Sequence, residues 1–265
     1  MVERQKIELE LQQHRYHLEQ LVSDRTAELE ASNKELESYS YSIAHDLRTP
    51  LRTIVSFSQI LLSDAGQKLN EEELDSLQRV ITSGKRMALL IDDILQLARL
   101  GRDKMCFTDV DLSRICNEVA MHLSQRQSDS QVRWKIAENV KVSGDQDMLT
   151  LLMENLCINA LKYSSKVSHP IIEFGEQVTD KQSVYYLRDN GVGFEQQYAH
   201  KIFGIFQRLH PASEYEDTGI GLATVQRIVE RHGGRVWAEG ELNAGATIYF
   251  TLNDRRMIHL PQLAS

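Results

Sequence analysis

The sequence predicts an α+β protein in which a long helical N-terminal part precedes a domain of mixed helices and strands. Its length of 265 residues suits about two domains. Over the first hundred residues, apolar side chains recur at helical spacing, whereas later segments alternate between helical periodicity and short apolar runs typical of strands. Because those helices and strands do not alternate strictly, an α+β sandwich is favoured over a doubly wound parallel sheet.

A heptad seam runs through residues 1 to 40, which contain neither Gly nor Pro. From Val22 the seam shifts by a four-residue insertion, a stutter, and continues with a period of seven to Ile43. A single solvated amphipathic helix would show a similar pattern. Since the seam continues without a break into the next segment, a parallel dimeric coiled coil is favoured. Before the stutter, the seam consists of Ile7, Leu11, His14, Leu18 and Leu21.

The next segment predicts two amphipathic helices joined by a short turn. The first is expected to end near Gly66, which would supply a left-handed cap, and the second to begin at Asn70, an N-cap followed by three acids. Its apolar positions continue to Leu100. One hairpin buries only one stripe, so two copies are expected to form a dimeric four-helix bundle.

His45 projects away from the apolar stripe of its own helix, roughly 160° from the centre of that stripe. The plain alternative is a solvated surface histidine. Pro50 removes the amide that would bond the Asp46 carbonyl, so a bend is expected just beyond His45.

Beyond residue 101 the expected helices cover 112–123, 147–163 and 222–232, and the expected strands 132–136, 140–142, 171–174, 184–187 and 246–252. The tail from 253 to 265 has no periodicity and is expected to be disordered.

Composition excludes several classes of protein. A net charge of -8 argues against nucleic-acid binding, which needs clustered positive charge. No apolar run approaches the roughly 20 residues of a membrane span, and the N-terminus lacks a signal-peptide core. A cytoplasmic protein without direct membrane insertion is expected. Cys106, Cys116 and Cys157 form no CxxC pair and are expected to be reduced packing residues.

Polar residues on helix 147–163 suit a metal and phosphates. Asn155 and Asn159 share one face, and Lys162 lies three residues further on the same side. Amide oxygens are reasonable Mg²⁺ ligands, and lysine supplies a point charge. By itself, such an NxxxN pair more commonly consists of two solvent-exposed surface residues without a binding role.

Two glycine segments follow. Asp189 ends a predicted strand, where Gly191 and Gly193 let a backbone approach a ligand, although a simple turn would have the same sequence. Gly219 and Gly221 open a helix whose free amides suit phosphate. This second segment is neither a P-loop nor a complete dinucleotide fingerprint. Between the two segments, apolar residues 203–206 and the polar stretch 212–217 predict a mobile lid.

In their order, these motifs resemble those of sensor histidine kinases, and the resemblance covers about residues 36–252. The sequences of the phosphoacceptor and lid motifs are most similar to those of kinases that follow phytochrome, GAF or PAS sensor domains. It implies a coiled-coil linker over 1–38, a dimerisation and phosphotransfer hairpin over 39–101, a Bergerat-type ATP-binding sandwich over 102–252 and a tail over 253–265.

The resemblance also implies roles for particular residues. ATP would phosphorylate His45, and Asp46 would orient the imidazole and accept its proton. Asn159, assisted by Asn155, would bind Mg²⁺, and Lys162 would reach the phosphates. The adenine would meet Tyr163, Asp189 and, as a weaker candidate, Thr247. The glycines that would shape the ATP cavity are Gly191, Gly193, Gly219 and Gly221.

The family's acid-x-x-Thr pattern is matched by Asp46 and Thr49, which makes dephosphorylation of a response regulator a second possible activity. One departure is Asp217, where the motif often has Gly, and it is expected to alter lid mobility rather than abolish ATP binding. Arg208 is a phosphate contact or a solvated arginine.

The implied partners are a second copy, a response-regulator receiver domain and an upstream sensor domain or sensory protein. The alternatives are a protein that is mainly a phosphatase, or a dimeric scaffold without catalysis.

Overall fold

The computed structural model describes residues 2–100, 104–126, 132–179, 182–210, 215 and 217–253. They fall into two compact units, residues 1–88 and 89–265, which are described separately. The predicted disordered tail lies outside the described residues except for Asn253. In the part of the chain that is described, no helix is both long enough and apolar enough to cross a bilayer.

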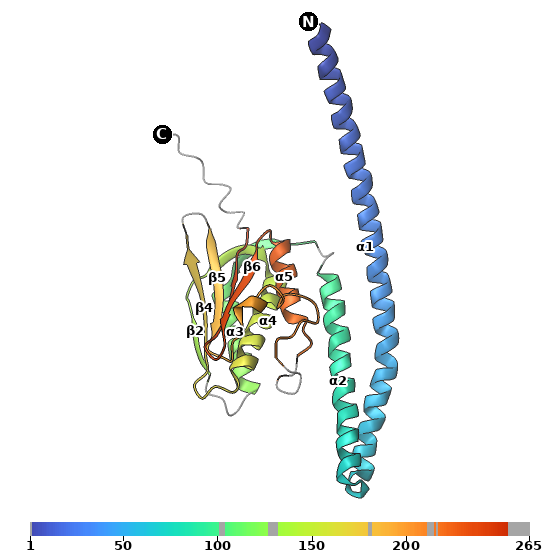
Figure 1. The fold of residues 1–265 in the computed structure, drawn as a ribbon, viewed down its shortest axis with the longest axis vertical. Coiled ribbons are helices and arrows are strands. Elements are labelled where there is room, and N and C mark those ends of the chain that lie inside the picture. Colours follow the sequence, from blue (N-terminus) through green and yellow to red (C-terminus); the bar gives the residue numbers. More distant parts are fainter. Residues whose placement is uncertain are drawn as a thin grey trace. The chain divides into compact units, whose positions relative to one another are not determined.

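A helical hairpin makes up the first unit and the start of the second (Figure 1). It consists of α1 (Val2–Ala65), the short 3-10 helix η1 (Gly66–Lys68) and α2 (Glu71–Arg99). Asn70 caps α2 as predicted: its side chain accepts from the Glu73 amide, and the Glu73 carboxylate accepts from the Asn70 amide, both at 2.9 Å. The predicted left-handed cap at Gly66 is wrong, because Gly66 starts η1 without a positive φ.

The hairpin of the first unit buries one row of apolar side chains and exposes another. Leu51 and Ile81 are buried, and Gly84 lies so close to α1 that a Cβ there would stand 2.4 Å from Val55 Cγ2. Other apolar side chains of α1 remain about half exposed or more, both before and after the stutter. They are Leu11, Leu18, Leu21, Val22, Ile43, Leu47, Ile54, Phe57, Ile60 and Leu61. A single copy therefore leaves a long apolar face uncovered.

The second unit is an α/β sandwich. Its main sheet has the strand order β2-β4-β5-β7-β6, in which β2 and β4 are parallel and the other pairs antiparallel. Figure 1 shows α3, α4 and α5 lying together on one side of this sheet. A separate pair joins β1 to β3. The elements are β1 (Phe107–Asp111), α3 (Leu112–Arg126), β2 (Arg133–Ile136), β3 (Lys141–Asp145), α4 (Gln146–Ser164), β4 (Ile171–Val178), β5 (Ser183–Asp189), η2 (Gln196–Tyr198), α5 (Gly221–Arg231), β6 (Val236–Glu241) and β7 (Gly245–Phe250).

This architecture confirms the predicted α+β class. Every helix and strand expected beyond residue 101 is present, whereas β1, β6 and η2 were missed. The core lies between the helices and the sheet, where Leu149, Leu152 and Phe174 are almost fully buried. Cys116 and Cys157 belong to it with their thiols 3.9 Å apart, in agreement with their predicted packing role, whereas Cys106 is exposed and that prediction is wrong for it.

A buried histidine ties the end of α5 to the start of α4. His232 Nδ1 lies 2.8 Å from the Ile228 carbonyl, and Nε2 accepts from the Asp145 amide at 3.1 Å. These partners fix the neutral tautomer with its proton on Nδ1. Asp145 in turn caps α4 by accepting from the Met148 amide. Burial lowers the pKa of His232 below its ordinary value.

The α/β unit is therefore expected to lose stability as the pH falls below about 6.5, because the unfolded chain then binds a proton at His232 more readily than the fold does. His232→Gln should weaken this pH dependence. It should also lower the free energy of unfolding at pH 7 by about 1–3 kcal/mol, because the Asp145 amide would be paired less well. Urea unfolding between pH 5 and 8 measures both effects. His122→Gln, at an exposed histidine of α3, is the control. An unchanged pH profile in His232→Gln would contradict this account.

Candidate functional site

The predicted phosphoacceptor histidine lies on α1 in the first unit. His45 Nδ1 is 3.3 Å from Asp46 Oδ1, and the two side chains are 67% and 76% exposed. Because an ionised carboxylate can only accept, this contact favours the tautomer with the proton on Nδ1 and leaves Nε2 as the unprotonated, nucleophilic nitrogen. Thr49 is also exposed, one helical turn further along α1. The helix continues through Pro50, so the expected bend remains a prediction.

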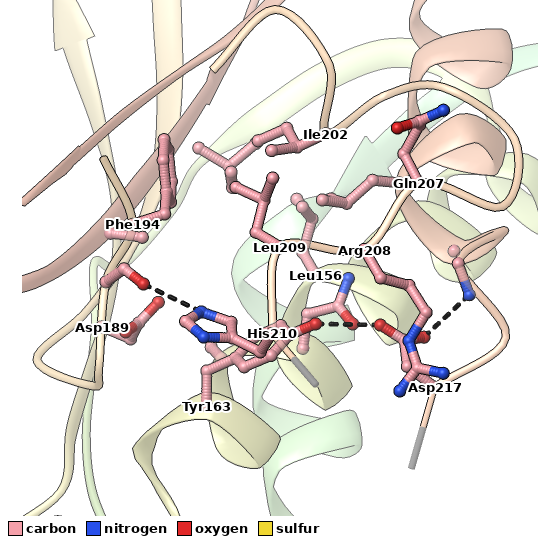
Figure 2. Close-up of a pocket in the computed structure, with 18 of the residues that line it drawn as sticks. Leu156, Tyr163, Asp189, Phe194, Ile202, Gln207, Arg208, Leu209, His210 and Asp217 are labelled. Atoms are coloured by element: carbon pink, nitrogen blue, oxygen red, sulfur yellow. Dashed lines mark hydrogen bonds between the residues drawn. The ribbon is translucent and has the colours of Figure 1, made fainter. Parts of the chain in front are cut away.

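A pocket opens in the second unit beside α4, β5 and β7 (Figure 2). Its apolar wall comes from Leu156, Leu187, Phe194, Ile202 and Ile248, among others. In Figure 2, Asp189 and Asp217 lie on opposite sides of the view, and Tyr163 and His210 lie between them. Most of the residues that the motifs singled out for ATP are brought together here, although they span more than sixty positions of the chain.

Asp189 supplies a buried carboxylate at the end of β5. Oδ1 accepts from the Gly191 amide at 2.8 Å, and the Ala246 amide also donates to the carboxylate. Burial outweighs these hydrogen bonds and raises the pKa of Asp189 to about 6. At neutral pH the group is therefore an ionised acceptor facing an apolar pocket, which suits the recognition of an N–H donor.

The first glycine segment brings the Asp189 loop against its neighbours. Val192 N donates to the Tyr163 carbonyl at 3.1 Å, which ties the loop to the end of α4. Gly193 has a φ of 60°, and a Cβ there would lie 1.9 Å from the Glu241 carbonyl oxygen. Only glycine satisfies both the backbone angle and this close approach.

The two asparagines of α4 face the N-terminus of α5. A Cβ at Gly221 would stand 2.8 Å from Asn155 Oδ1 and 3.7 Å from Asn159 Nδ2, so the absence of a side chain keeps this space clear. Asn155 Nδ2 donates to the Leu151 carbonyl, and Lys162 Nζ donates to Asn159 Oδ1 at 3.2 Å. Two amide oxygens, an ammonium group and helix amides fit a Mg²⁺-phosphate group.

The segment that follows the first glycines forms a partial cover. Phe203 is buried, whereas Phe206 is exposed at a φ of 63° and donates its amide to the Gly219 carbonyl at 2.9 Å. Tyr215 packs against Tyr163 and His210 at ring distances of 5.2 and 5.7 Å. Of the predicted lid, residues 212–214 and 216 lie outside the described residues.

Arg208 and His210 have partners within the same unit. Arg208 Nη2 donates to the Tyr215 carbonyl at 2.7 Å, and Arg208 also lines the pocket, so it is not simply solvated. His210 Nε2 lies 3.0 Å from the Gly193 carbonyl oxygen. His210 was not predicted as a pocket residue, since a histidine in a loop has no periodicity that would place it.

Thr247 does not line the pocket, which contradicts its assignment as an adenine contact. Asp189 pairs with Ala246 across β5 and β7, so Ala246 and Ile248 face the pocket and Thr247 faces the opposite side of the sheet. Its hydroxyl accepts from Arg188 Nε at 3.1 Å. The alternation of side chains along β7 could have placed Ala246 at the pocket.

Two family models match the chain. The model described as "His Kinase A (phospho-acceptor) domain" matches residues 36–103, and the one described as "Histidine kinase-, DNA gyrase B-, and HSP90-like ATPase" matches residues 144–256. Together they cover most of the chain and both parts of the candidate site.

Similar proteins include "Cyanobacterial phytochrome B" of Nostoc sp., 37% identical over 86% of this chain and 30% of that protein. "Sensor histidine kinase WalK" of Bacillus subtilis is 28% identical over 85% of this chain and 38% of that protein. The chain thus spans about a third of the length of these relatives.

Solved structures show the same fold. That of ShkA full-length in complex with AMPPNP has a TM-score of 0.59 at 23% identity, over 82% of this chain and 46% of that one. Acinetobacter baumannii histidine kinase AdeS has a TM-score of 0.54 at 20% identity, over 79% of this chain and 98% of that one.

The chain has a phosphoacceptor hairpin followed by an ATPase domain of the kind shared by histidine kinases and gyrase. This combination defines the class of protein-histidine kinases. The chain belongs to the histidine kinases, with the phosphoacceptor domain followed by the ATPase domain.

Proposed function

We propose that the chain binds ATP in the pocket of the second unit, transfers the γ-phosphoryl group to His45, and passes it to an aspartate of a response regulator. The observation that carries this proposal is the meeting of Asn159, Asp189 and Gly221 around one pocket, with Lys162 bonded to Asn159 and Asn155 beside Gly221. The same chain carries an exposed His45 in contact with Asp46.

The chemistry assigned to His45 follows from its contact with Asp46. Nε2 attacks the γ-phosphorus, the bond from that phosphorus to the bridging oxygen breaks, and ADP leaves. The Nδ1 proton is held by Asp46, which stabilises the positive charge on the phosphorylated ring and then accepts that proton. In the second step a carboxylate oxygen of the partner aspartate attacks the phosphorus, the bond from phosphorus to Nε2 breaks, and neutral imidazole leaves as Nδ1 regains its proton from Asp46.

The pocket residues bind and orient the substrate. Asp189 would accept from the adenine amino group, and the ring of Tyr163 would pack beside the base. Asn159, assisted by Asn155, would hold Mg²⁺, which when bound neutralises phosphate charge. Lys162 would add a positive charge next to them. The helix amides at Gly221 would face the phosphates.

The uncovered apolar face of the first unit supports a homodimer. Residues 39–101 would form a four-helix bundle with a second copy, since each hairpin leaves one apolar row exposed. Residues 1–38 would continue as a parallel coiled coil that carries the signal, 102–252 would be the catalytic domain, and 253–265 a tail. We place the chain in the cytoplasm, downstream of a sensor domain or sensory partner, because its relatives include phytochromes.

Incubation with γ-labelled ATP and Mg²⁺ tests the proposed function. We expect label on the parent, and none on His45→Gln or Asn159→Ala, because the first lacks the acceptor and the second a Mg²⁺ ligand. His17→Gln, an exposed histidine on the same helix, should be labelled like the parent. Adding a receiver domain should move the label to that domain. An unlabelled parent would leave a phosphatase or a scaffold as the function.

A second activity, dephosphorylation of the response regulator, is favoured by the exposure of Thr49 one turn from His45. Thr49→Ala should keep labelling of His45 near the parental rate. The same variant should lose about tenfold or more in the removal of phosphate from a phosphorylated receiver domain, because the hydroxyl that would position a water is lost. Thr49→Ser is the matched control. Equal phosphatase rates in Thr49→Ala and the parent would contradict this role.

A further inference from the structure

Asp217 is an acidic side chain inside the pocket proposed to bind a polyanion. Its carboxylate lies 2.8 Å from Lys162 Nζ, accepts from the Tyr163 hydroxyl at 2.9 Å and accepts from the Gly219 amide at 3.1 Å. Figure 2 shows Asp217 bonded to Tyr163 on the side of the pocket away from Asp189. The segment before the second glycines is thus held to α4 by a charged group.

The ion pair is mostly shielded from water. The Lys162 and Asp217 side chains are only 17% and 19% exposed. Burial alone would raise the pKa of Asp217, but Lys162, with the hydrogen bonds from Gly219 and Tyr163, lowers it below the ordinary value. Burial lowers the pKa of Lys162, and Asp217 offsets part of this effect. Asp217 is therefore ionised at neutral pH, and its charge matters more here than on an open surface.

Lys162 can satisfy several acceptors, since an ammonium group has three donors. One already goes to Asn159 Oδ1 and another to Asp217. A phosphate that approaches Lys162 therefore meets a charge that Asp217 has largely neutralised, and it meets the negative carboxylate as well. Both effects oppose binding, and both grow with the charge on the ligand.

We propose that Asp217 is an internal competitor of the nucleotide phosphates for Lys162, and so a residue that sets nucleotide affinity. The inference rests on the proposed function. The third donor of Lys162 can reach a phosphate while Asp217 stays in place, but a second phosphate contact with Nζ requires Asp217 to leave. Its departure would also remove one tether between α4 and the segment that leads to Gly219. Tyr215 would still pack against Tyr163, with the ring centroids 5.2 Å apart.

The test is calorimetric binding of ATP, ADP and adenosine in the presence of Mg²⁺. Asp217→Asn and Asp217→Gly should both bind ATP about tenfold more tightly than the parent, which corresponds to about 1.4 kcal/mol. ADP should gain less, and adenosine, which carries no phosphate, should bind with parental affinity. Asp147→Asn, an exposed acid in the first turn of α4, is the charge-matched control and should change nothing.

A double-variant cycle assigns the gain to Lys162. In a Lys162→Met background, Asp217→Asn should no longer tighten ATP binding, because the cation for which the two anions compete is gone. Unchanged or weaker ATP binding in both Asp217 variants would overturn the inference, and weaker binding would make Asp217 part of the ligand set instead. An equal gain for adenosine would overturn it too, because lid mobility rather than charge would be the cause.

Failure of this inference is distinguishable from failure of the proposed function. If the parent binds ATP and the Asp217 variants bind it no more tightly, only the competition is overturned. If neither the parent nor the Asp217 variants bind ATP, the proposed function falls, and the inference with it.

Discussion

The Asp189→Asn variant is expected to bind ATP at least about a hundredfold more weakly than the parent and yet to be no less stable at pH 7. The carboxamide would keep one acceptor for the Gly191 and Ala246 amides, but it would turn its NH₂ group toward the adenine amino group. Two donors facing each other in an apolar pocket cost on the order of 3 kcal/mol relative to a charge-assisted bond.

Stability should follow the opposite trend. The pKa of Asp189 is raised to about 6 in the fold, above the ordinary value near 4, so its ionised form costs the fold on the order of 3 kcal/mol above pH 6. That cost disappears as the pH falls toward 4, because the folded protein binds the proton more tightly. Asp189→Asn removes the cost at every pH.

Calorimetry with ATP and urea unfolding at pH 5 and pH 7 measure the two effects of Asp189→Asn. The stability advantage of the variant should be larger at pH 7 than at pH 5. Parental ATP affinity in Asp189→Asn would rule out Asp189 as the adenine contact. A variant that is much less stable than the parent at pH 7 would mean that the buried charge is structurally required.

Gly193→Ala is expected to destabilise the α/β unit by about 2–4 kcal/mol and to lower its melting temperature by roughly 5–15 °C. The new methyl group would collide with the Glu241 carbonyl oxygen at 1.9 Å, in addition to the cost of a φ of 60°. Because Gly193 also lines the pocket, relief of this collision should move the Asp189 loop and weaken ATP binding.

The control for Gly193→Ala is Gly66→Ala. A Cβ at Gly66 would meet only Leu62 Cδ1, at an ordinary 3.6 Å, and the backbone there has no positive φ. Thermal unfolding followed by circular dichroism compares the two variants. If both variants have the melting temperature of the parent, the close approach of Gly193 to the Glu241 carbonyl oxygen of β6 does not require glycine at this position.

Local signals in the sequence predicted the helices and the longer strands. The reciprocal cap of Asn70 and Glu73 depends on residues three positions apart, and such short-range geometry can be recognised in a sequence. By contrast, β1 is five residues long with two acids and is fixed by pairing with β3, thirty or more positions away. Strand β6 has its partner β7 close by in the sequence, but its glycine and two acids interrupt the apolar pattern that would have marked it as a strand.

In the candidate site, too, local patterns predicted some residues, and others are brought together only by the fold. Of the residues that motif spacing singled out, Asn159 and Asp189 line the pocket, while Lys162 contacts Asn159. Helix and strand periodicity fixes the faces on which such residues lie. Thr247 was misplaced by one position, which in a strand reverses the face. No pattern predicted that Asp217 would pair with Lys162, since the two are brought together only by the folding of the segment before Gly219 onto α4.

The most direct test of the account is to locate the phosphoryl group after the parent chain has been incubated with ATP and Mg²⁺. The phosphorylated protein would be digested at neutral or alkaline pH, where an N–P bond survives, and its peptides analysed by mass spectrometry. We predict one acid-labile phosphoryl group on the peptide that contains His45. An acid-stable phosphoryl group on a Ser, Thr or Tyr, or a phosphohistidine at any position other than His45, would contradict the central claim.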